Sequence, residues 1–135
     1  MSILPINRLL FTAAILATLT AGIHILVGTP EIETPLLQSA MPLDLRLLLL
    51  ACWHLVSACL TISAIGFFIG ARPANRVSSR QMVKLLSFLW IAFGLVFVAV
   101  ALVYAGTPML ARLPQWILLL PVGALGLWGA KQSPS

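Results

Sequence analysis

Four long apolar stretches constrain this chain more than any other feature of its sequence. They cover residues 9–28, 47–70, 85–104 and 113–130. A helix needs about 20 apolar residues to cross the hydrocarbon core of a bilayer, and three of these stretches approach or exceed that length. Hydrophobic residues make up 61% of the 135-residue chain and charged residues only 8%, too few polar side chains to cover a water-facing domain. The sequence therefore predicts an integral membrane protein.

Turn-forming residues separate the apolar stretches from one another. Gly28, Thr29 and Pro30 follow the first stretch, and the connection over residues 30–43 contains two more prolines, so we expect the first helix to stop at Gly28 and the connection to be irregular. A Gly-Thr-Pro sequence also ends the third stretch, at residues 106–108. We predict an all-α, polytopic membrane protein with four transmembrane helices in an up-down-up-down bundle, forming one domain over residues 1–135, with spans at about 8–28, 45–70, 81–105 and 114–130.

The charged residues are distributed unevenly between the two sides of such a bundle. The expected inner side carries six cations: Arg8, Arg72, Arg76, Arg80, Lys84 and Lys131. The first connection, on the other side, carries all the acids: Glu31, Glu33 and Asp44. The positive-inside rule then places both termini in the cytoplasm and the acidic connection outside. We predict a multi-pass protein of the cell membrane, most simply a bacterial inner membrane, whose basic residues meet lipid headgroups and bind no nucleic acid.

Small residues recur along one face of two of the predicted helices. Ala13, Ala17 and Ala21 share a face of the first helix, and the fourth helix has glycines at positions 123, 126 and 129. Such stripes let helix backbones approach closely in lipid. We expect them to pack within the chain, with a homo-oligomer or another membrane-complex partner as the alternative.

Two histidines lie inside the apolar stretches, where an unpartnered imidazole is costly. His24 is about 6 Å below the outer end of the first predicted helix, and His54 is about 10 Å below the outer end of the second. Because these helices are antiparallel neighbours, we expect the two imidazoles to meet. Glu31, Glu33 and Asp44 lie just above them in sequence, and the five side chains together suit zinc or another divalent metal.

Three other interpretations of the histidines remain open at this point. His24 and His54 could ligate a haem iron, with Trp53, Phe93 and Phe97 lining the pocket, although tight packing of the two helices leaves little room for a porphyrin. They could also exchange protons, or simply hydrogen-bond between helices. No HxxxH or HExxH pair, phosphate-binding loop or buried carboxylate points elsewhere.

The sequence limits the function to two classes. The first is a non-enzymatic membrane protein, an accessory subunit or a small transport or binding unit with an outward-facing site of histidines and carboxylates. The second is a membrane enzyme or redox protein that uses His24 and His54 with a metal or haem. A divalent metal and a haem both stay open as the group bound by His24 and His54, and the sequence indicates no particular ligand.

Overall fold

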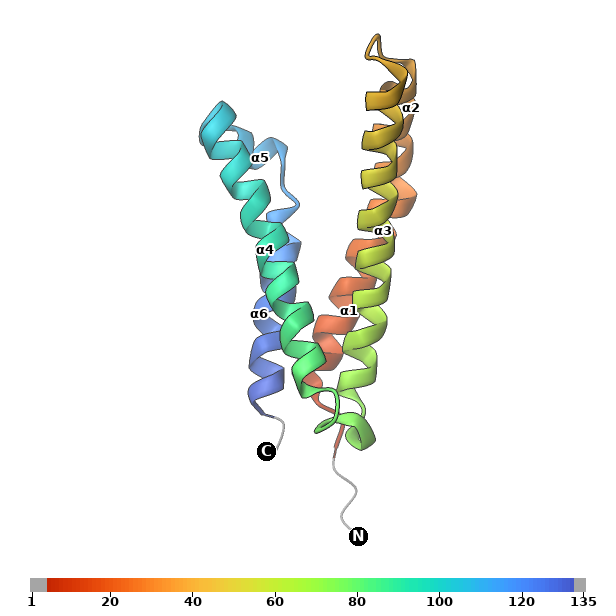
Figure 1. The fold of residues 1–135 in the computed structure, drawn as a ribbon. Coiled ribbons are helices and arrows are strands. Elements are labelled where there is room, and N and C mark those ends of the chain that lie inside the picture. The colour runs from red at the N-terminus through yellow and green to blue at the C-terminus, as the bar shows by residue number, and fades with distance from the viewer. Residues whose placement is uncertain (1–4, 133–135) are drawn as a thin grey trace.

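The chain folds into helices joined by short turns, as the computed structural model shows for residues 5–132 (Figure 1). Within that range no strand is present. The elements are α1 (Arg8–Gly22), the π-helical turn η1 (Ile23–Gly28), α2 (Thr29–Gln38), α3 (Leu43–Ala71), the 3-10 turn η2 (Pro73–Asn75), α4 (Arg80–Ala105), α5 (Met109–Arg112) and α6 (Trp116–Lys131).

Three helices are long and apolar enough to cross a membrane. They are the continuous helix Arg8–Gln38, made of α1, η1 and α2, together with α3 and α4. The fourth, α6, is apolar but has only 16 residues. The all-helical class and the presence of membrane-length helices are therefore confirmed.

The expected stop at Gly28 and the irregular connection after it are wrong. Gly28 and Thr29 have right-handed helical backbone angles, with φ of −67° and −58°, and the helix continues to Gln38. Pro30 lies just after the π turn η1, at the start of α2, so the N–H group that proline lacks falls where the hydrogen-bond pattern changes from π to α. The π turn just before it changes the register without ending the helix.

The helices form two antiparallel hairpins that meet at one end and diverge at the other (Figure 1). The first hairpin packs α1 against α3, and the second packs α4 against α6. Contact between α1 and α6 joins them near the beginning of α1 and the end of α6. We call this the closed end. The largest buried side chains of the core are Trp90, Phe67, Leu10, Val83 and Val122.

The small-residue stripes pack inside the chain, as the sequence predicts. Ala13 and Ala17 are fully buried. On α6, a side chain at Gly126 would collide with Phe67, and one at Gly129 would collide with Leu10. Glycine is thus required on α6 because the neighbouring helices lie against its backbone.

Asn7 connects three helices at the closed end. Its side-chain amide Nδ2 donates a hydrogen bond to the Gly129 carbonyl on α6 (2.9 Å), and its Oδ1 accepts one from the Leu10 N–H in α1 (3.2 Å). Its backbone N–H donates to the Ala71 carbonyl at the end of α3 (3.1 Å). The residue is only 2% exposed. Asn7 therefore caps α1 and fixes the ends of α3 and α6 beside it.

Candidate functional site

The diverging hairpins enclose an apolar cleft. Its larger cavity has a volume of about 750 Å³ and lies between α1, η1, α2 and α3 on one side and α4, α6 and the segment before α6 on the other. A second cavity of about 560 Å³ adjoins it. Both cavities are lined by His24, Ile32, Trp53, Val56, Phe93 and Phe97.

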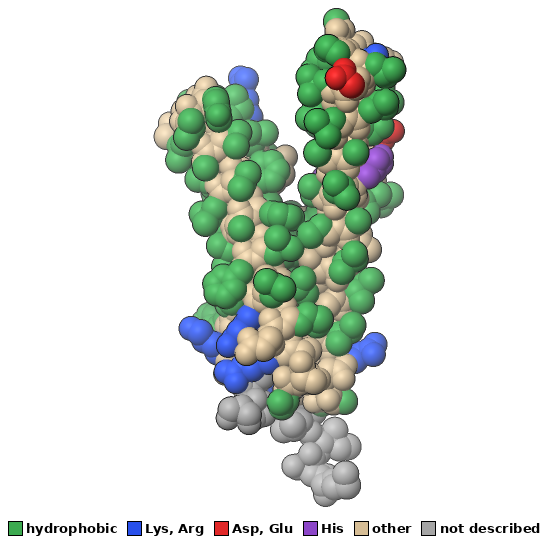
Figure 2. All heavy atoms as spheres, viewed as in Figure 1, with side chains coloured by type: hydrophobic (Ala, Val, Ile, Leu, Met, Phe, Trp, Pro, Cys, Tyr) green, Lys and Arg blue, Asp and Glu red, His purple; other side chains and the backbone are tan. Residues whose placement is uncertain are grey.

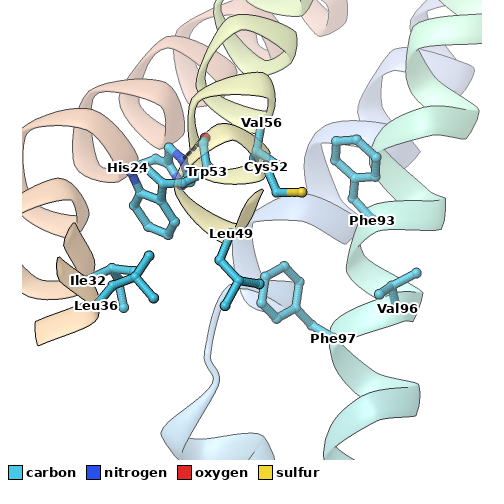
Figure 3. Close-up of a pocket in the computed structure, with 10 residues that line it drawn as sticks. All are labelled: His24, Ile32, Leu36, Leu49, Cys52, Trp53, Val56, Phe93, Val96 and Phe97. Carbon is cyan, nitrogen blue, oxygen red and sulfur yellow. Dashed lines mark hydrogen bonds between the residues drawn. The ribbon is translucent and has the colours of Figure 1, made fainter. Parts of the chain in front are cut away.

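His24 and Trp53 lie in direct contact in the cleft (Figure 3). The two rings stack, with centroids 3.9 Å apart and planes inclined by 19°. His24 Nε2 also lies 3.4 Å from the Trp53 backbone carbonyl oxygen, which accepts a long hydrogen bond when Nε2 carries the proton. His24 belongs to the π turn η1, and π turns in helices are frequent at functional sites.

Two residues of the Gly-Thr-Pro sequence hold the indole of Trp53 in place. Trp53 Nε1 donates a hydrogen bond to the Thr29 hydroxyl oxygen (3.0 Å). A Cβ atom on Gly28 would lie only 2.9 Å from the indole atom Cζ2. Gly28 is therefore needed because it lets the indole ring approach closely, and Thr29 because it accepts the hydrogen bond from the indole N–H. Interpreting this sequence only as a helix stop misses both roles.

Aromatic side chains of α4 form the opposite wall. Phe93 and Phe97 are one helical turn apart and face the cleft across from Trp53 (Figure 3). Trp53, Phe93 and Phe97, which the haem interpretation places around one pocket, line the same cavity. The cleft thus has aromatic rings on both walls.

The structure does not bring the predicted ligand set together. His24 lines the cleft and Glu31 lines its larger cavity, but His54 is exposed and lines neither cavity. Glu33 and Asp44 do not line them either. Among residues 5–132 no group of three or more His, Cys, Asp and Glu side chains is placed to hold a metal ion. The ring that meets His24 is that of Trp53.

Polar side chains from both hairpins lie in the larger cavity. Besides His24, they are Thr20 from α1, Glu31 from α2, Arg112 from the end of α5 and Gln115 from the turn before α6. Sequence reasoning did not select Arg112 or Gln115. The available signal was that Arg112 is one of only two cations on the side of the acidic connection, together with Arg46.

No protein-family model, curated protein or solved structure matches this chain. The chemistry of the cleft itself is therefore the basis for assigning a function.

Proposed function

We propose that this protein is a non-enzymatic, four-span membrane protein that binds a lipid-soluble molecule in the cleft between its hairpins. The observation that carries the proposal is an apolar cleft with aromatic walls and a few polar groups at one side. Small-molecule sites typically have volumes of roughly 300–1,000 Å³ and the same mixture of apolar walls and sparse polar groups. The larger cavity, at about 750 Å³, is within that range.

The choice of a binding unit over a redox protein depends on the two histidines. A haem held by two imidazoles needs both in one cavity, and only His24 lines the cleft. A divalent metal site needs three or more ligands, which the described residues do not gather. A stacked imidazole with one ring nitrogen near a carbonyl instead offers a ligand a flat surface and a single polar contact.

The proposed topology places four spans across a cell membrane, in the simplest case a bacterial cytoplasmic membrane. Its support is the charge distribution: Figure 2 shows most of the Lys and Arg side chains in view at the closed end, a few at the far ends of the hairpins, and acidic side chains farther along the first hairpin. The positive-inside rule then places the closed end and both termini in the cytoplasm and the cleft in the outer half of the membrane. The fourth span, α6, is about 24 Å long, so it reaches only the lower part of the cleft.

This topology predicts the labelling of two engineered cysteines. In a variant with Cys52→Ala and Cys59→Ala, Gln38→Cys should react with a membrane-impermeant maleimide added to intact cells, because it ends α2 on the outer side. Ser78→Cys, in the basic turn, should react only after the cells are opened. The reverse pattern would overturn the proposed orientation.

Fluorescence quenching by brominated lipids tests the binding proposal. Trp116→Phe and Trp128→Phe leave two tryptophans: Trp90, which is 1% exposed, and Trp53 in the cleft wall. In detergent micelles to which a small fraction of lipid with brominated acyl chains is added, a lipid chain inside the cleft quenches Trp53 on contact. We expect quenching that saturates at a low brominated-lipid fraction, because the lipid displaces detergent from the site before it replaces the surrounding detergent.

A matched variant with a filled cleft provides the control. Val56→Phe places an aromatic ring in both cavities. Unlike Val56→Trp, it adds no tryptophan fluorescence. It should remove the saturating component and leave only quenching that rises in proportion to the brominated lipid. Quenching that never saturates in the protein that retains Val56 would overturn the proposal.

A further inference from the structure

The larger cavity is lined by one acid and one base, supplied by opposite hairpins. Glu31 comes from α2 and Arg112 from the end of α5, and both line the larger cavity. Both side chains are exposed. Between residues 5 and 132 no carboxylate lies within 4.0 Å of a basic nitrogen, so neither charge is neutralised by the other.

Both charged side chains lie near the depth of lipid headgroups. The Asn7–Gly129 hydrogen bond puts the beginning of α1 level with the end of α6. From that level Glu31 is about 35 Å along the helix, beyond a hydrocarbon core of about 30 Å but within the 40–45 Å that includes headgroups. Arg112 ends α5, which follows the outer end of α4, a helix about 39 Å long. The charges therefore border the outer part of the cleft, and its aromatic walls lie deeper.

An acid and a base at one opening are complementary to a head that carries both charges. A guanidinium binds a phosphate with two parallel hydrogen bonds, and a carboxylate accepts hydrogen bonds from an ammonium. We infer that the ligand of the cleft is a phospholipid with a phosphoethanolamine head, whose phosphate contacts Arg112 and whose primary ammonium contacts Glu31. This inference rests on the lipid-binding function proposed above.

Other common heads fit the pair less well. A trimethylammonium has no N–H group to donate to Glu31, so a phosphocholine head loses the hydrogen bond and keeps only the charge attraction. A phosphoglycerol head has hydroxyl groups that donate to the Glu31 carboxylate, but it has no cation to compensate the carboxylate charge. The apolar part also fits, because two adjoining cavities that meet at Trp53 and Phe93 can each take one acyl chain.

Competition between brominated lipids with different heads tests this inference. In the protein with Trp116→Phe and Trp128→Phe, we compare brominated phosphatidylethanolamine, phosphatidylcholine and phosphatidylglycerol, each added to the same detergent micelles. Phosphatidylethanolamine should reach half of the saturating quench at about one fifth of the mole fraction that phosphatidylglycerol needs, since one charge contact near a membrane surface changes binding by about that factor.

Three variants separate the contributions of the two charges. Glu31→Gln should abolish the preference for phosphatidylethanolamine over phosphatidylcholine, and Arg112→Gln should weaken the binding of all three lipids. Glu33→Gln is the matched control, because it removes a second acid from the same helix that does not line the cleft. It should keep the preference unchanged.

The outcomes distinguish the two proposals. Saturating quenching that is equal for the three heads, or strongest for phosphatidylglycerol, would overturn the headgroup inference and leave lipid binding in the cleft standing. An absence of saturating quenching with any head would overturn both. A preference for phosphatidylethanolamine that Glu31→Gln leaves intact would show that Glu31 does not contact the ammonium.

Discussion

Replacing Gly123 with alanine is expected to lower the free energy of unfolding by about 1–3 kcal/mol, the usual cost of overpacking a filled interior. A Cβ atom at this position would lie 2.7 Å from the Ser87 carbonyl oxygen and 3.0 Å from the Ile91 nitrogen. Both are backbone atoms of α4, so no side-chain rotation can relieve the collision. The methyl group must push α6 away from α4 along the most closely packed pair of helices.

The chain supplies a matched control at Gly22. A Cβ atom there would meet nothing within 4 Å, and alanine is the better helix former. Gly22→Ala should therefore leave stability unchanged or slightly increased. Reversible unfolding in mixed micelles, followed by circular dichroism, measures both variants. Equal stabilities for Gly123→Ala and the unsubstituted protein would contradict the close contact between α4 and α6.

The second large effect is expected for Trp53→Ala. The substitution removes the ring that stacks on His24, the donor to the Thr29 hydroxyl and the packing against Gly28. Full truncation of a buried aromatic side chain costs about 3–5 kcal/mol, and because Trp53 is only partly buried we expect about 2–3 kcal/mol. The melting temperature in lipid nanodiscs should fall accordingly.

Two further variants identify the origin of that loss. Trp128→Ala removes an equally large ring that is 63% exposed on α6, and it should change the melting temperature little. Trp53→Phe keeps an aromatic ring beside His24 but loses the hydrogen bond to Thr29, so its stability should be intermediate. If Trp128→Ala were as damaging as Trp53→Ala, the effect would reflect general loss of aromatic surface and not the contacts of the cleft.

Hydropathy predicted the long helices because lipid selects for apolar composition, but it could not locate the end of the first one. In a sequence, Gly28 and Pro30 suggest a stop. In the structure, Pro30 lies just after the π turn within one continuous helix, and Gly28 makes room for Trp53. Trp53 lies 25 residues after Gly28 in the chain. Its contact with Gly28 therefore becomes visible only when the two helices are packed together.

The sequence predicted how far along each helix the site residues lie, but it did not predict the direction in which each side chain points. Matched depths on antiparallel helices correctly brought α3 next to His24, yet successive residues of a helix differ in direction by about 100°. Trp53, one residue before His54, is therefore the side chain that meets His24. Phe93 and Phe97 were predictable because their spacing of four puts them on one face. Arg112 was not, because its position depends on how α5 folds back over the cleft.

The contacts of Asn7 give the molecule a mechanical property. Because this one residue joins α1, α3 and α6 at the closed end, the two hairpins can rotate relative to one another about a common pivot there. At an arm length of about 35 Å, a rotation of about 5° at the pivot moves the tips by about 3 Å. Helices change their tilt when bilayer thickness changes. If the helices span a bilayer, a change in its thickness is therefore expected to change the width of the cleft between the hairpins.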